Sequence, residues 1–132
     1  MAKLQGKWRL DSSDNFDEFM KAVGVGMVMR KLGGATKPNQ EISQEGDEWS
    51  IKTLSTVKNT EVKFKLGEAF DETTADGRKV KTTITAEGDT KLVQDQKGDP
   101  DSVLTRELTD DSTMTMSCVA KGVTATRVYK RE

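Results

Sequence analysis

The sequence predicts an all-β protein in which about ten antiparallel strands follow one another up and down and close into a barrel, with a helix-turn-helix as its lid. Apolar and polar residues alternate in segment after segment. Turn signals such as Glu87-Gly88-Asp89 separate these segments at hairpin spacing. The inward positions mix apolar residues with Thr, Ser, Gln, Cys and Arg, which a solid core would not tolerate without partners. The barrel should therefore enclose a water-containing cavity.

Composition and charge narrow the class of protein. The chain has 132 residues, with 21 Lys and Arg against 22 Asp and Glu, a net charge of −1. We expect one domain spanning residues 1–132 and a monomer without nucleic-acid partners, because balanced charge gives no broad affinity for polyanions. The hydrophobic fraction is 33%, below the roughly 45–50% usual for globular chains. A polar or fillable interior would account for this.

The lack of histidine and the single cysteine exclude several kinds of catalytic and metal site. The chain has no histidine, and Cys118 is its single cysteine. This removes His-based triads and metal sites, cysteine zinc clusters and intramolecular disulfides, so we expect no catalytic residue, metal or cofactor. The first residues have no apolar run resembling a signal peptide, and no stretch reaches the length of a membrane span. We expect a soluble cytoplasmic protein.

The N-terminal third predicts one strand and two helices. Ala2 to Asp11 alternates as a strand, and Ser12-Ser13-Asp14-Asn15 supplies natural helix caps. A first helix is predicted by apolar spacing at Phe16, Phe19, Met20 and Val23. A second helix runs from Met27 to Leu32, with Gly33-Gly34 as its stop. This hairpin, about residues 15–35, is too small to stand alone and should cap the barrel.

Two later strands place arginines on their mainly apolar faces. One face carries Val123, Ala125, Arg127 and Tyr129, and the other carries Ser102, Leu104, Arg106 and Leu108. A guanidinium cannot shed its charge, and burying it unpaired is costly. An anion or well-held water should meet each arginine, and we interpret that anion as the carboxylate of a lipid.

Three stretches resemble the intracellular lipid-binding proteins, and within them the cytosolic fatty-acid-binding proteins. They are Gly6-Lys7-Trp8-Arg9-Leu10 through Asn15-Phe16-Asp17-Glu18-Phe19-Met20, Gly24-Val25-Gly26 and Arg30-Lys31; Phe64-Lys65-Leu66-Gly67-Glu68 with Phe70-Asp71-Glu72-Thr73-Thr74-Ala75-Asp76-Gly77-Arg78; and Thr126-Arg127-Val128-Tyr129. The resemblance covers the whole chain. It implies a lipocalin-like, ten-stranded barrel with ligand in a large internal cavity.

The resemblance also implies a function and a head-group site. In the subgroup with the heart, adipocyte, epidermal and myelin proteins, two arginines and a tyrosine hold the ligand carboxylate, and these fall on Arg106, Arg127 and Tyr129. The implied function is a non-enzymatic intracellular carrier of long-chain fatty acid. The expected cavity and portal lining is Phe16, Met20, Val25, Met29, Pro38, Thr53, Ser55, Val57, Asp76 and Cys118.

Departures from the family pattern leave an alternative open. Val57 stands where many members have a portal phenylalanine, and Gly98 lies near a position that carries tryptophan in several vertebrate members. Gln44-Glu45-Gly46-Asp47 and Thr105-Arg106-Glu107-Leu108-Thr109 also resemble the cellular retinoic-acid-binding branch, which uses the same arginines and tyrosine. A retinoid carrier is therefore the runner-up. Further alternatives are an isomerase whose reactive group is Cys118, Tyr129 or a carboxylate, and a membrane-stacking protein.

Individual side chains also allow two interpretations. Arg106 either contacts the carboxylate, directly or through water, or pairs with an internal acid. Thr53, Ser55, Gln94 and Gln96 are expected to hold internal water, and Trp8 and Trp49 to be structural. Lys21, Arg30 and Lys31 form a basic lid patch, which is either a solvated helical face or, as the resemblance implies, a nuclear-import patch that also touches anionic membranes.

Overall fold

A computed structural model describes residues 2–56, 58–74 and 77–132. Its helices are η1 (Ala2–Leu4, a 3-10 turn), α1 (Phe16–Ala22) and α2 (Met27–Ala35). Its strands are β1 (Gly6–Asp14), β2 (Asn39–Glu45), β3 (Glu48–Leu54), β4 (Thr60–Lys65), β5 (Phe70–Thr73), β6 (Lys79–Glu87), β7 (Lys91–Lys97), β8 (Ser102–Asp110), β9 (Thr113–Ala120) and β10 (Val123–Arg131).

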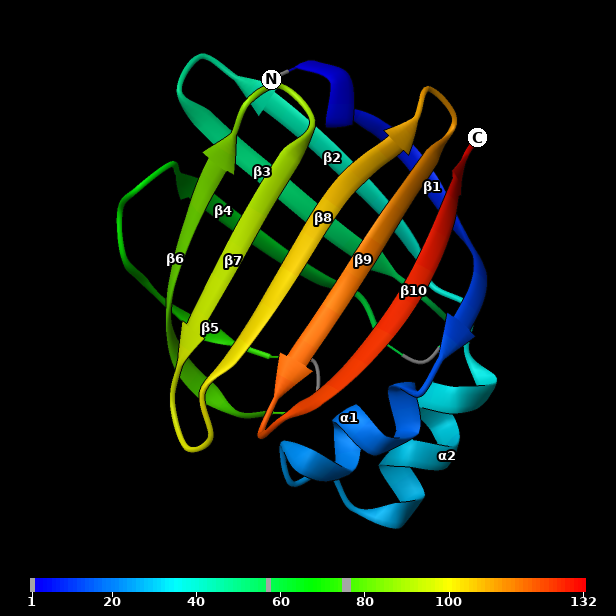
Figure 1. The fold of residues 1–132 in the computed structure, drawn as a ribbon. Helices are drawn as coiled ribbons and strands as arrows, with labels where there is room; N and C mark the ends of the chain where they lie inside the picture. The colour runs from blue at the N-terminus through cyan, green and yellow to red at the C-terminus, as the bar shows by residue number, and fades with distance from the viewer. Residues whose placement is uncertain (1, 57, 75–76) are drawn as a thin grey trace.

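The strands form one antiparallel sheet that curls into a nearly closed barrel. Within the described residues its ten strands have the order β4-β3-β2-β1-β10-β9-β8-β7-β6-β5, so β1 pairs with β10 and the two edge strands are β4 and β5. Figure 1 shows β6 to β10 passing in front of β2 to β4, with α1 and α2 at one end of the barrel and η1 towards the other. The predicted all-β barrel with a helical lid is confirmed.

Period-two alternation orients the wall residues as predicted. On β10, Ala125, Arg127 and Tyr129 are buried, whereas Thr124 is exposed and Val128 is half-buried. Because successive side chains of a strand point to opposite faces, the buried set faces the barrel interior. The two tryptophans, expected to be structural, are fully buried: they are Trp8 and Trp49.

The start of the chain differs from the prediction. The expected strand from Ala2 to Asp11 is wrong at both ends, because η1 occupies the first residues and β1 begins at Gly6 and continues to Asp14. Gly6 has φ +136, a conformation that favours glycine. Beyond it, the Trp8 indole Nε1 donates a hydrogen bond to the Leu4 carbonyl at 3.0 Å. This turn buries Leu4 together with Trp8.

The lid helices correct two further expectations. Asn15 precedes α1 but makes no side-chain cap; its Nδ2 donates instead to the Thr124 carbonyl at 3.0 Å. Helix α2 does not stop at Gly33-Gly34 but continues to Ala35. A Cβ at Gly33 would lie 2.9 Å from the Met20 sulfur. Glycine here permits close packing of the two helices, and tertiary contact overrides the local stop signal.

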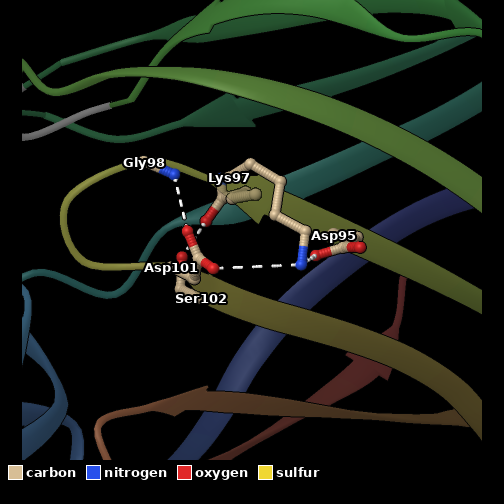
Figure 2. A network of polar contacts seen from close by, with 6 residues as sticks. Asp95, Lys97, Gly98, Asp101 and Ser102 are labelled. Carbon is tan, nitrogen blue, oxygen red and sulfur yellow. Dashed lines mark hydrogen bonds and ion pairs between the residues drawn. The ribbon is translucent and has the colours of Figure 1, made fainter.

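The turn between β7 and β8 is held by polar contacts, shown in Figure 2. The Gly98 backbone N–H donates to Asp101 Oδ1 at 2.9 Å. Lys97 Nζ lies 3.5 Å from Asp95 Oδ1 and 3.9 Å from Asp101 Oδ2. These contacts support the register in which Ser102, at the start of β8, faces Gln96 of β7.

Candidate functional site

A cavity lies between the lid and the barrel and continues inward. The outer part has a volume of about 380 Å³ and the deeper part about 180 Å³. Both parts are lined by Phe16, Phe19, Pro38, Thr53, Thr60, Arg78 and Arg127. The outer part adds apolar residues of the lid, whereas the deeper part adds glutamines, an acid and Arg106. The interior therefore grades from an apolar mouth to a polar base.

The cavity brings together most of the residues that the sequence singled out. The outer part is lined by Phe16, Met20, Val25, Met29, Pro38, Thr53 and Ser55. The deeper part is lined by Arg106, Cys118, Arg127 and Tyr129. Val57 and Asp76, expected at the portal, lie outside the described residues. These described residues line the cavity, and their part in ligand binding stays a prediction.

Arg106 is held by two amide oxygens. The residue is 4% exposed, its Nε donates to Gln40 Oε1 at 3.0 Å, and its Nη1 donates to Gln94 Oε1 at 2.7 Å. Burial lowers the pKa of Arg106, and electrostatic interactions with surrounding acidic groups, Tyr129 first, oppose this shift. The charge is thus buried against neutral dipoles, with no carboxylate in direct contact among the described residues.

Gln40, on β2, determines the direction in which the Tyr129 hydroxyl can donate a hydrogen bond. Gln40 is 2% exposed, and its Nε2 donates to the Tyr129 oxygen at 3.1 Å and to the Met116 sulfur at 3.5 Å. Since the tyrosine oxygen accepts from Gln40, its own proton can be donated into the cavity. Burial raises the pKa of Tyr129, with Arg127 and Arg106 opposing, so the hydroxyl stays a donor at neutral pH.

Arg127, on β10, is the cation most available to a ligand. It is 7% exposed, and its Cζ lies 3.9 Å from the centroid of the Phe16 ring on the lid. Its Nε has no hydrogen-bond partner among the residues that the structure describes. A buried donor of this kind is costly to leave unpaired, and a carboxylate beneath Phe16 would satisfy it.

Glu72, on β5, is an internal acid that sequence reasoning missed. Its carboxylate accepts hydrogen bonds from Thr82 Oγ1 at 2.7 Å, Gln94 Nε2 at 3.0 Å and Gln96 Nε2 at 3.0 Å. The signal available was weak, because β5 has only four residues, Phe70–Thr73, and an acid on its inward face breaks the apolar pattern. The two glutamines, expected to hold water, bind this acid, and Gln94 connects it to Arg106.

Cys118 is a buried thiol on β9. It is 1% exposed, and burial raises its pKa to about 11, with Arg106 and Arg127 opposing the shift. The thiol is therefore protonated at neutral pH, which favours a small lining residue over a reactive nucleophile. No group of three or more His, Cys, Asp or Glu side chains in the described part of the chain could hold a metal ion.

The basic lid patch is not uniform. Lys21 and Lys31 are exposed, whereas Arg30 is half-buried. Its Nε donates to Asp17 Oδ1 at 3.2 Å and its Nη1 to the Val25 carbonyl at 2.7 Å. Arg30 therefore ties α2 to α1 and contributes less to surface charge than its neighbours. Neither of these helices, nor any other in residues 2–56, 58–74 and 77–132, is long and apolar enough to cross a bilayer.

Comparison with known proteins gives consistent matches over the full chain. The model of the lipocalin / cytosolic fatty-acid binding protein family matches residues 5–132. The sodium/calcium exchanger regulatory protein 1 of Doryteuthis pealeii is 56% identical over 98% of this chain and 97% of its own length. A fatty acid-binding protein of Tyrophagus putrescentiae is 48% identical over the whole of both chains. The Schistosoma mansoni fatty acid binding protein in complex with arachidonic acid superposes with a TM-score of 0.97 at 39% identity, covering 100% of this chain and 98% of that chain.

Proposed function

The chain belongs to the lipocalin / cytosolic fatty-acid binding protein family, and on this premise we propose that it carries a long-chain fatty acid in its cavity, with the carboxylate held by Arg127, Tyr129 and Arg106. Members of this family are non-enzymatic carriers, as the resemblance implied. Because the family is cytosolic, we place the carrier in the cytoplasm. The exposed Lys21 and Lys31 would favour transient contact with anionic membranes.

The observation that supports this proposal most strongly is the buried Arg127 side chain, whose Nε has no hydrogen-bond partner among the described residues. A buried guanidinium with an unpartnered Nε borders both parts of the cavity. A carboxylate placed there accepts from Arg127 and from the Tyr129 hydroxyl, which Gln40 leaves free to donate. Arg106, whose Nε and Nη1 are already occupied, acts through its charge or through water. The acyl chain then lies towards the apolar mouth under the lid.

The acyl chain and the carboxylate make different contributions to the binding free energy. Each buried methylene contributes about 0.8 kcal/mol, so a long acyl chain offers on the order of 10 kcal/mol before the cost of ordering it. A charge-assisted hydrogen bond adds about 1.5–3 kcal/mol net. We therefore expect chain length to set affinity, and Arg127 to set head-group preference and ligand orientation.

Replacing Arg127 tests the head-group assignment. Arg127→Gln should weaken palmitate binding by about tenfold to a hundredfold, the equivalent of one charge-assisted contact. Binding of hexadecanol, which has the same chain and no charge, should change much less. Titration calorimetry with both ligands gives the comparison, and Arg9→Gln, an exposed arginine on β1, is the matched control. Equal losses for acid and alcohol would remove Arg127 from the proposal.

A retinoid carrier is the competing function. It uses the same three polar side chains, so the cavity mouth and not the head-group site must discriminate. Two of the relatives favour fatty acid: one is a fatty acid-binding protein and another is a fatty acid binding protein in complex with arachidonic acid. Side-by-side titration with oleate and all-trans-retinoate decides the matter. Tighter binding of retinoate would replace the fatty-acid proposal.

A further inference from the structure

The interior holds an acid whose charge the carboxylate site does not use. We infer that Glu72 is a specificity-determining residue: by offsetting the charge of Arg106 through Gln94, it leaves the charge of Arg127 for the ligand and restricts the cavity to head groups that carry a single negative charge. This inference rests on the proposed function, since it concerns which lipid head groups the same cavity accepts.

A single amide connects the two opposite charges. Gln94 is 2% exposed; its Oε1 accepts from Arg106 Nη1 at 2.7 Å, and its Nε2 donates to both Glu72 oxygens, at 3.0 and 3.2 Å. The amide dipole thus points its negative end at the cation and its positive end at the anion. Glu72 and Arg106 therefore favour the same orientation of the Gln94 amide. In a low-dielectric interior, the hydrogen bonds of such a chain polarise and strengthen one another.

Neutral donors hold the rest of the Glu72 carboxylate. Thr82 Oγ1 and Gln96 Nε2 both donate to Oε1, and Ser102 fixes Gln96 by donating to its Oε1 at 2.7 Å. No cation lies within 4 Å of Glu72 among the described residues. Neutral donors solvate a charge but do not cancel it, so the field of Glu72 acts across Gln94 on Arg106. Burial lowers the pKa of Arg106, and Glu72, after Tyr129 and Cys118, is one of the groups that oppose this shift.

Arg127 contrasts with Arg106 in this respect. It has the Phe16 ring at 3.9 Å and an unpartnered Nε, with no acid in contact among the described residues. Arg78 lines both parts of the cavity and Lys58 the outer part, and neither is without a partner of its own. Apart from Arg78, the charges at the polar base are two arginines and one glutamate, and one bound carboxylate makes this set neutral.

The chemical consequence concerns doubly charged lipids. A fatty acid or an alkyl sulfate brings one negative charge, which Arg127 matches. An alkyl phosphate at about pH 8 carries close to two charges, because its second pKa is about 6. The second charge would find Arg106 already offset and Glu72 repelling it. The cavity should thus disfavour phosphate monoester lipids relative to fatty acids with the same chain.

The test compares the dissociation constants of hexadecyl phosphate and palmitate at about pH 8, where the phosphate is close to doubly charged. We expect Glu72→Gln, which keeps the side-chain shape, to lower the ratio of the phosphate constant to the palmitate constant by about tenfold. The double variant Arg106→Gln/Glu72→Gln removes both charges and should restore the wild-type ratio. Glu107→Gln, an exposed acid beside Arg106 on β8, should leave the ratio unchanged.

The outcomes separate this inference from the proposed function. If Glu72→Gln weakens or strengthens both ligands equally, Glu72 is only structural and the inference fails, although palmitate still binds. If wild-type protein does not bind palmitate, the proposed function itself fails. Should the variant not fold, wild-type protein suffices: lowering the pH from about 8 to about 5 removes the second phosphate charge, and hexadecyl phosphate should then tighten relative to hexadecyl sulfate. No change in that ratio overturns the inference.

Discussion

Gln40 connects Arg106 to Tyr129 in the head-group site through two hydrogen bonds. Replacing Gln40 by leucine should therefore lower the free energy of unfolding. Gln40→Leu keeps a similar volume on β2 but removes the acceptor of Arg106 Nε and the donor to Tyr129. A hydrogen bond to a charged group contributes about 1.5–3 kcal/mol and a neutral one about 1 kcal/mol. The buried leucine is more apolar than glutamine, and this stabilises the folded state by about 1 kcal/mol. The net loss should be about 2 kcal/mol of the free energy of unfolding.

Urea unfolding followed by the fluorescence of Trp8 and Trp49 measures this loss, and a loss of about 2 kcal/mol should lower Tm by about 6 °C in a chain of this size. The matched control is Gln44→Leu on the same strand, whose side-chain amide donates to the Gly46 carbonyl at the surface. That change should cost no more than about 0.5 kcal/mol. If the two variants are equally stable, Gln40 does not hold Arg106 in solution, and the account of how the Tyr129 proton is oriented is refuted.

Two further predictions concern stability. Cys118 has its pKa raised from 9.0 to about 11; the stability from burying its neutral thiol should be fully present below about pH 9 and lost as pH rises towards 11, because the unfolded chain releases its proton first. The difference in unfolding free energy between wild type and Cys118→Ala should shift by about 2–3 kcal/mol over that range, and a constant difference would contradict it. A Cβ at Gly98 would lie 2.8 Å from Val80 Cγ1, so Gly98→Ala should destabilise the β7–β8 turn of Figure 2 by about 1–2 kcal/mol. Val80→Ala should relieve the strain in a double-mutant cycle, and strictly additive effects would argue against this contact.

The failures of the sequence-based predictions have a common physical cause. The stop of α2 at Gly33-Gly34 was predicted from local propensity, but the contact with Met20 uses that glycine as packing space and the helix continues. The strand expected from Ala2 was predicted from alternation, but the bond from Trp8 to Leu4 turns the chain into η1. In both cases a preference of a few tenths of a kcal/mol to about 1 kcal/mol per residue is smaller than what buried packing contributes.

The sequence by itself determined the barrel, the helical lid and the inward direction of Arg106, Arg127 and Tyr129. It could do so because the side-chain direction along a strand depends only on a period of two, which is local. The tertiary structure alone decided what those side chains meet. Arg106 lies 66 positions from Gln40 in the chain and 12 from Gln94, and Gln94 lies 22 from Glu72. These contacts depend on strand register and barrel closure, which no single segment encodes.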